Sequence, residues 1–254
     1  MTVAITRKVS PAITRCELTH LRREPIDVAL AARQHVEYEQ CLAGLRCRVV
    51  SLPAAPELPD SVFIEDTAIV AAELAVVTRP GAASRRAETP AVARVLAEYR
   101  PVAAIQAPGT LDGGDVLCVG RRVFVGLSVR SNRNGIEQLR ALLSPHGYEI
   151  EALPITGCLH LKSAVTQVAP GVVLLNPDWV DPAAFEGYGR IEVETSEPYA
   201  ANALLIGNAV LYPTAFPRTG ARLEGAGIRL VPVDVSELAK AEGAVTCCSL
   251  ILQD

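Results

Sequence analysis

Short apolar runs recur along the chain in pairs, and most pairs are followed by a helical pattern and then by one more extended run. Tight turns separate the members of three pairs, at Gly120 and Arg121, at Pro170 and Gly171, and at Gly207 and Asn208. Such short turns between apolar runs are typical of β-hairpins. The paired runs occupy residues 62–70 and 74–78, 115–119 and 123–126, 164–168 and 172–176, and 203–206 and 209–212.

The segment after each hairpin predicts a helix and a closing strand. A helix is expected from Thr89 to about Tyr99, because Thr89 suits a cap and Pro90 suits the first turn. A second helix over 134–143 places Ile136, Leu139 and Leu143 on one face. Two less regular helices are expected from residue 181 and over 217–226. Closing strands are then predicted at 102–105, 148–153, 190–193 and 229–233.

The repeat has a period of about 40–50 residues, which favours a cyclic arrangement. The last unit contains only 244–252, and the beginning of the chain supplies what is missing from it: a strand at 4–5, a helix at 27–43 ended by Gly44, and a strand at 47–52. We therefore predict an α/β fold, a five-bladed α/β propeller of pseudo-fivefold ββαβ repeats closed by pairing of the N- and C-terminal segments. Residues 1–254 would form a single catalytic α/β-propeller domain, although an ordinary mixed α/β domain remains an alternative.

Composition and charge narrow the classes of protein to which this chain could belong. No stretch approaches the roughly 20 apolar residues of a membrane span, and Met1 is not followed by a basic and then apolar leader. The seven cysteines are an odd number, which argues against a disulfide framework. A net charge of −4 gives no footprint for nucleic acid. We expect a cytoplasmic protein, a monomer or homodimer, that binds a small molecule and neither nucleic acid nor membrane.

Polar residues stand at comparable places in several of the repeats. Glu65 and Asp66 follow an apolar run, Asp112 precedes two glycines, His160 lies in a short apolar segment, and Cys247 lies in the last apolar run. Each of these residues alone has an ordinary structural explanation, such as core packing for Cys247 or a turn for Asp112. If the repeats surround an axis, however, they converge on one site.

These groups suit attack on a guanidinium. A cysteine thiolate is the nucleophile, and a neighbouring cation favours its formation. Asp66 and Asp112 could match the N–H groups of a guanidinium, and His160 could act as general acid and then as general base. Arg85 and Arg130 could bind an α-carboxylate at the other end of the substrate. The pocket would then fit arginine or a derivative, with no metal.

Six segments resemble the dimethylarginine dimethylaminohydrolase (dimethylargininase) family, in order and over nearly the whole chain. They are DSVFIED at 60–66, TRPGAASRR at 78–86, LDGGDVL at 111–117, GLSVRSN at 126–132, LHLKS at 159–163 and TCCS at 246–249. The resemblance implies the five-bladed propeller of the guanidine-modifying (amidinotransferase) superfamily. It also implies hydrolysis of Nω-methylated L-arginine to L-citrulline and dimethylamine or methylamine, through a covalent thiouronium on cysteine and without a cofactor.

Carried over by position, the resemblance implies Cys247 as the nucleophile, His160 as acid and base, and Asp112 as its acidic partner. Cys248 is not the nucleophile. The resemblance further implies substrate-binding roles, in which Asp66 contacts the guanidinium, Leu18 lies at the tip of a lid, and Ala241 or Glu242 adds a backbone contact. The full substrate-binding set is Leu18, Asp60, Glu65, Asp66, Arg85, Arg130, Ala241 and Glu242.

Two alternatives remain open at this stage. One is a hydrolase of unmethylated arginine, agmatine or another guanidine, although Arg85 and Arg130 argue against a substrate without a carboxylate. The other is a propeller-shaped binding protein like the ribosome anti-association factor. A binding protein has no reason to place Asp112, His160 and Cys247 in its channel.

Overall fold

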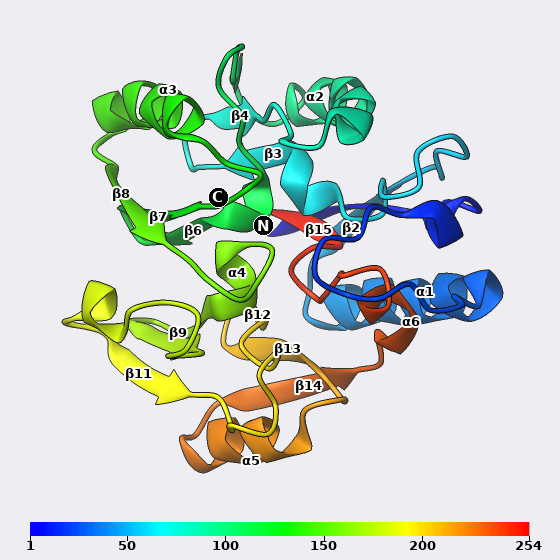
Figure 1. The fold of residues 1–254 in the computed structure, drawn as a ribbon, viewed down its shortest axis with the longest axis vertical. Helices are drawn as coiled ribbons and strands as arrows, with labels where there is room; N and C mark the ends of the chain where they lie inside the picture. The colour runs from blue at the N-terminus through cyan, green and yellow to red at the C-terminus, as the bar shows by residue number, and fades with distance from the viewer. Residues whose placement is uncertain (254) are drawn as a thin grey trace.

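Five three-stranded sheets stand around a common axis, with helices on the outside of the ring (Figure 1). The computed structural model describes residues 1–253; residue 254 lies outside the described part. In every sheet the middle strand pairs antiparallel with the inner strand and parallel with the third strand. This is the predicted ββαβ repeat, and the five-bladed α/β propeller expected from the sequence is confirmed.

Four of the sheets are continuous in the chain. The first contains β3 (Ala68–Val70), β4 (Ala75–Val77) and β5 (Val102–Ala104), and the second contains β6 (Val116–Val119), β7 (Arg122–Leu127) and β8 (Glu149–Pro154). The third contains β9 (Val165–Ala169), β10 (Val172–Leu175) and β11 (Gly189–Glu192), and the fourth contains β12 (Leu204–Ile206), β13 (Ala209–Pro213) and β14 (Arg229–Val233).

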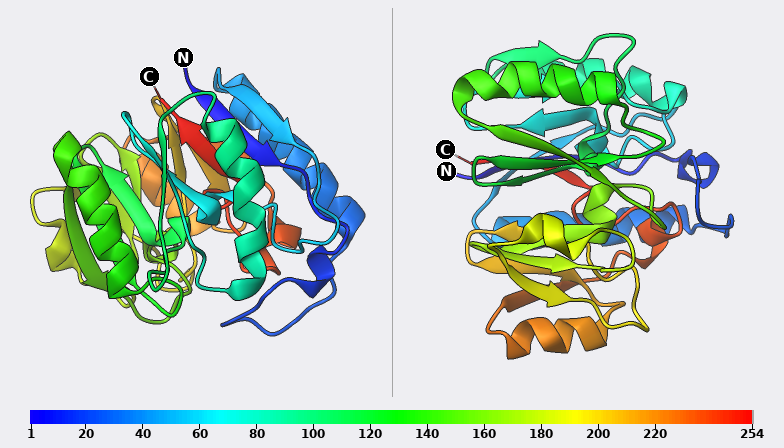
Figure 2. Two further views of the ribbon diagram at one scale, coloured as in Figure 1. Left: turned by 90° about the horizontal axis from the view of Figure 1, so that it is seen from above. Right: turned by 60° about the vertical axis from the view of Figure 1, so that its left-hand side comes forward.

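The fifth sheet is built from both ends of the sequence. Its inner strand is β15 (Ser249–Leu252), which pairs antiparallel with β1 (Val3–Arg7), and β1 pairs parallel with β2 (Arg48–Leu52). Residues 3 and 252 are therefore direct partners. The first and last described residues lie side by side at one end of the molecule (Figure 2). The predicted closure by the two terminal segments is correct.

A helix joins the second and third strands of each sheet, except in the β9–β11 sheet. The helices are α1 (Val28–Gly44), α2 (Thr89–Leu96), α3 (Arg133–Leu143) and α5 (Pro217–Gly225). Local sequence explains where two of them begin: Asp27 accepts the N–H of Leu30 and Asn132 accepts the N–H of Gly135, both at 2.9 Å. The helix expected from residue 181 is only a 3-10 turn (Pro182–Phe185), because four residues later the chain must turn back toward β11.

Five clusters of buried apolar side chains hold the ring together, and each cluster joins two neighbouring sheets. One contains Ile5 of β1 and Ala75 of β4, and another contains Leu174 of β10 and Val210 of β13. The remaining three clusters bridge the remaining three pairs of neighbours in the same way. Each fully buried leucine or isoleucine side chain contributes about 1.5–3 kcal/mol, and no sheet has a complete core of its own.

The polar residues singled out from the sequence do not lie in strands. Glu65 and Asp66 lie in the 3-10 turn Ile64–Thr67, and Asp112 immediately precedes another, Gly113–Asp115. His160 precedes the one-turn helix α4 (Leu161–Ala164), and Cys247 lies in a turn at 245–248. The strand expected at 244–252 begins only at Ser249. The prediction of strands there was wrong because a single turn is too short to show a helical period.

These turns share one position in the repeat. Each ends at the residue where the inner strand of its sheet begins, or just before it, and a corresponding turn at 198–201 lies shortly before β12 of the fourth sheet. The inner strands line a central channel of about 580 Å³, with residues such as Ile69, Leu117, Thr166, Leu205 and Leu250 on its wall. The turns therefore lie together at one end of this channel.

All seven cysteines, each within the described part, are free thiols. Among residues 1–253 no helix has both the length and the apolar character needed to cross a bilayer.

Candidate active site

A small cavity of about 20 Å³ lies where the turns meet. Its wall includes Cys247, His160 and Asp66 together with Asp60, Arg85, Arg130, Ala241 and Glu242, eight of the eleven residues predicted from the sequence. The remaining three lie elsewhere. Asp112 is fully buried behind His160, Glu65 lines the central channel, and Leu18 packs on the apolar cluster of α1 and β14.

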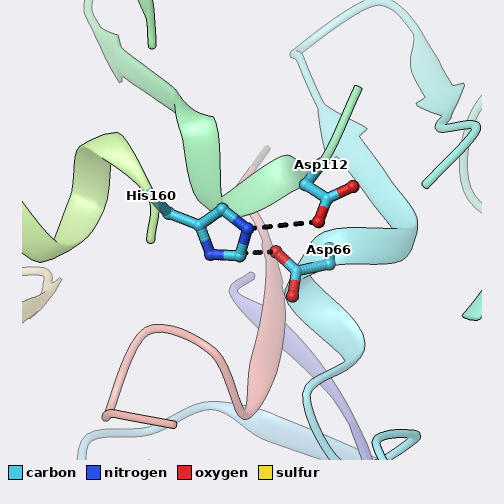
Figure 3. A group of neighbouring side chains, drawn as sticks. All are labelled: Asp66, Asp112 and His160. Carbon is cyan, nitrogen blue, oxygen red and sulfur yellow. Dashed lines mark hydrogen bonds and ion pairs between the residues drawn. The ribbon is translucent and has the colours of Figure 1, made fainter. Parts of the chain in front are cut away.

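His160 lies between two carboxylates (Figure 3). Its Nε2 is 3.1 Å from Oδ2 of Asp112, and its Nδ1 is 3.8 Å from Oδ1 of Asp66. Burial acts to lower the pKa of His160, but the negative charges of Asp66, Asp112 and Asp115 outweigh it and raise the pKa to about 9. The imidazole is therefore protonated at neutral pH.

Asp112 is held in place from its other side. Its Oδ1 accepts the N–H of Gly81 at 2.8 Å, and its own N–H donates to Oγ of Ser131 at 3.0 Å. A side chain on Gly81 would meet the backbone of Arg130 at 2.4 Å, so glycine is required for this close approach. Oδ2 of Asp112 is thus directed to His160.

Asp66 is kept ionised by its neighbours. It accepts the N–H of Gly114 at 2.9 Å and is ion-paired with Arg85. Burial alone would raise its pKa, but His160 and Arg85 lower it well below the usual range. Asp66, Asp112 and His160 offer three possible ligand atoms within 4.8 Å of one another, an arrangement that could hold a metal ion. It equally suits a small organic cation.

Cys247 is partly exposed to the cavity, whereas Cys248 is fully buried in the core. Burial, with the negative charges of Glu65 and Asp66 adding to it, raises the pKa of the Cys247 thiol to about 12. The thiol is therefore protonated at neutral pH in the free protein. A cation bound beside it would favour the thiolate.

The two predicted arginines have different surroundings. Arg85 is buried and donates to both oxygens of Glu88, to Asp66 and to the carbonyl of Phe63. Its Nη1 makes one of the two hydrogen bonds it can donate. Arg130 is less constrained, because its guanidinium makes one hydrogen bond to the described residues, from Nη2 to Oγ1 of Thr19 at 3.1 Å. Arg130 therefore has more capacity to bind an added carboxylate.

The segment 16–26 covers the cavity, and carboxylates hold it down. Glu242 accepts the backbone N–H groups of three consecutive residues, Thr19, His20 and Leu21. Asp60 accepts the N–H of Glu17 at 3.2 Å. We call residues 16–26 the lid.

Sequence reasoning missed two buried polar residues that organise the site. Asp115 accepts the hydroxyls of Ser128 and Ser131, each at 2.6 Å, and the N–H of Leu161 at 3.0 Å, which ties the Arg130 loop to the residue after His160. Asn202 lies just before β12 of the fourth sheet, at the place corresponding to the other site residues. The rule that identified Glu65 and His160, a polar residue just before the inner strand, would also have identified Asn202.

Comparison with known proteins gives a consistent result. No family model matches the chain. N(G),N(G)-dimethylarginine dimethylaminohydrolase of Streptomyces coelicolor is 38% identical over 253 residues, which cover 99% of this chain and 97% of the relative.

Two solved structures are similar over their whole length. The dimethylarginine dimethylaminohydrolase of Pseudomonas aeruginosa, a cysteine-to-serine variant complexed with citrulline, has a TM-score of 0.94 at 33% identity and covers 98% of both chains. A histidine-to-glycine variant of dimethylarginine dimethylaminohydrolase, an adduct with S-methyl-L-thiocitrulline, has a TM-score of 0.94 at 32% identity. It covers 99% of this chain and 100% of its own.

Proposed function

This chain belongs to the dimethylarginine dimethylaminohydrolase family, and from that premise we propose that it hydrolyses Nω-methylated L-arginine to L-citrulline and a methylamine. The observation that carries the proposal is the position of Cys247 in one cavity with His160 and Asp66. A nucleophile, an acid and an anchor for a cation are there within reach of one guanidinium.

Substrate binding activates the nucleophile in this proposal. The guanidinium of the substrate enters beside Asp66, next to a thiol that is otherwise protonated. Its positive charge offsets the negative charges of Glu65 and Asp66 near the sulfur and lowers the pKa of the thiol, which loses its proton to solvent water because His160 is already protonated. Sγ of Cys247 then bonds to the central guanidinium carbon.

His160 serves both halves of the reaction. Because its pKa is about 9, the imidazolium is ready to protonate the methylated nitrogen as the carbon–nitrogen bond breaks. The neutral imidazole then takes a proton from water, which attacks the same carbon and releases citrulline and the thiol. Asp112, bonded to Nε2, sets the orientation of the ring in both steps.

The amino-acid end of the substrate is bound under the lid. We assign the α-carboxylate to Arg130, with the remaining Nη1 donor of Arg85 beside it. Backbone groups of Leu18 and of Ala241 or Glu242 bind the α-amino group. Asp60 and Glu242 act by holding the lid closed, and Glu65 acts from outside the cavity through its contact with the backbone of Cys247.

The test is citrulline release from monomethylarginine, asymmetric dimethylarginine, arginine and agmatine. Methylated arginines should be turned over and agmatine should not, because without a carboxylate Arg130 stays unpaired. Such a loss costs on the order of a thousandfold in kcat/KM. Comparable rates on agmatine would favour an amine-directed relative, preference for arginine itself would favour a deiminase, and no turnover at all would favour a binding protein.

We further infer that the enzyme needs no cofactor and works in the cytoplasm as a monomer or homodimer. The chemistry above uses only protein side chains and water, which supports the first point. Activity after exhaustive dialysis against a chelator tests the absence of a cofactor, and the mass in solution by light scattering tests the oligomeric state.

A further inference from the structure

Asn202 belongs to the unit of β12–β14, the only one whose entering turn contributed no predicted site residue. It is 3% exposed and lies between two turns that carry site residues. Its side chain makes three hydrogen bonds. Nδ2 donates to the carbonyl of Lys162 at 3.0 Å and to Oγ1 of Thr246 at 2.9 Å, and Oδ1 accepts the N–H of Thr246 at 3.0 Å.

These contacts use the whole carboxamide. Both Nδ2 hydrogens have acceptors, and Oδ1 has a backbone donor, so rotation of the amide by 180° would oppose like groups. Aspartate has the same shape but lacks both donors. The site therefore selects asparagine among side chains of this size.

The bonds continue through Thr246 to the other side of the nucleophile turn. Oγ1 of Thr246 accepts from Asn202 and donates to Oε2 of Glu65 at 2.8 Å. Glu65 in turn is ion-paired with Lys162, and its N–H donates to the carbonyl of Cys247 at 3.1 Å. The N–H of Thr246 and the carbonyl of Cys247, on either side of the nucleophile, are thus both hydrogen-bonded.

We propose that Asn202 is a positioning residue, which holds the turn that carries Cys247 against the turn that carries His160. Lys162 is two residues from His160 and Thr246 is one residue from Cys247, so a single buried side chain sets the relative placement of nucleophile and acid. Asn202 does not line the cavity and contacts no substrate. This inference rests on the proposed function for its kinetic consequence, but its structural consequence can be measured without it.

Two nearly isosteric changes test the proposal: Asn202→Asp removes the two donors, and Thr246→Val removes the shared hydroxyl. Because a misplacement of about 1 Å can cost a hundredfold in rate, each should lower kcat about a hundredfold while KM for methylarginine changes less than about threefold. Thr246→Ser keeps the hydroxyl and should restore turnover to near the wild-type value. Each variant is compared at a temperature well below its measured Tm.

A second measurement is alkylation of Cys247 by iodoacetamide at pH 9, followed by mass spectrometry. Release of the turn exposes a sulfur that is now only partly exposed, so alkylation should become several times faster while turnover falls. A general loss of stability would not raise the alkylation rate and lower the turnover rate in a protein that is still fully folded. If the wild-type protein turns over no methylarginine, the proposed function fails. The difference in alkylation rate between the variants and the wild type then still tests the positioning role.

Asn176 offers a matched control. It is also 3% exposed, its Nδ2 donates to the carbonyl of Pro198 at 3.0 Å, and its Oδ1 accepts the N–H of Asp178 at 3.0 Å; neither of these two partners is a predicted site residue. Asn176→Asp should lower Tm but leave both rates near wild type. The proposal is overturned if Asn202→Asp and Thr246→Val leave turnover and alkylation within twofold of wild type. It is equally overturned if Asn176→Asp reproduces their effects.

Discussion

At the scale of single residues, adjacent cysteines have opposite environments. Sγ of Cys247 faces the cavity, whereas Cys248 is fully buried and its Sγ lies 3.5 Å from the carbonyl of Ala244. The same turn thus supplies one thiol to the site and one to the core. Only the first can meet a substrate.

Replacement of each thiol should separate these roles. Cys247→Ser should lower kcat by on the order of a thousandfold or more, because serine has no readily formed anion. Cys248→Ser keeps a donor toward Ala244 and should retain most activity. Steady-state citrulline release and acid-quenched mass spectrometry check both variants. Substrate-derived mass on Cys248 in the wild type would reverse the assignment.

The raised pKa of His160 also predicts how stability depends on pH. An unfolded histidine has a pKa near 6.5, whereas the folded value is about 9, so the folded state binds the proton more tightly. The resulting stabilisation is complete below pH 6.5 and is lost as the pH rises through 9. Tm of the wild type should therefore fall between pH 6.5 and 9.5 more steeply than that of His160→Gln. Parallel Tm curves for the two proteins would show that His160 is not protonated in the folded state.

At the scale of elements, the sequence pattern predicts the hairpins and helices of each repeat better than the short turns that precede the inner strands. The hairpins and helices such as α3 follow from apolar spacing, capping residues and turn residues, and they lie within a few residues of where they were expected. The site turns were read as strand because each is a single turn flanked by apolar residues. Hydrogen bonds between units, such as those of Asn202, join residues 40 and 44 positions apart. No local pattern contains that information.

The candidate site was predictable in chemistry and less so in geometry. Cys247, His160 and Asp66 do line one cavity, as their shared position in the repeat suggested. That Glu65 would turn away to Lys162 could not be read from its neighbour Asp66, because alternation along a strand fails in a 3-10 turn. Arg85 is ion-paired with Glu88, three residues away, and with Asp66, which lies in a different turn. The pairing with Asp66 depends on the fold and could not be predicted from local sequence.

The lid is the element held most directly by a single side chain. Glu242→Gln removes the negative charge that accepts three successive backbone N–H groups of the lid. Charged acceptors strengthen such hydrogen bonds to roughly 1.5–3 kcal/mol, so KM for methylarginine should rise about tenfold or more, with a smaller change in kcat. Limited trypsin cleavage after Arg22 and Arg23, both exposed in the lid, should become faster.

Glu224→Gln, an exposed position on α5, serves as the control for loss of one charge. It should leave KM and the cleavage rate unchanged. Unchanged trypsin sensitivity in Glu242→Gln would mean that the lid is held by its other contacts.

At the scale of the whole molecule, the closed ring of sheets does not require the chain ends to lie in the fifth sheet. The ends could be moved to another loop without changing the arrangement of the sheets. Because residues 3 and 252 are paired, a short linker from residue 253 to residue 1 would not strain the fifth sheet. A permuted chain that begins at Gly171, in the turn between β9 and β10, should fold and keep near-wild-type kcat/KM. Circular dichroism and citrulline release would check it.

A second permutant, opened between Cys158 and Leu159, provides the contrast. It should fold to a similar far-ultraviolet spectrum but lose most activity, because the new ends free the segment that enters the His160 turn. Equal activity of the two permutants would indicate that the turn is fixed by its own contacts alone.

The pairing of β15 with β1 has a consequence for the order of events during synthesis. β1 leaves the ribosome first, yet its antiparallel partner is made some 240 residues later, and the Cys247 turn is made just before that partner. The apolar clusters on either side of the fifth sheet, which include Ala4 and Ile5, stay incomplete for the same interval. Cys247 is therefore made among the last residues of the chain, just before the strand that closes the ring.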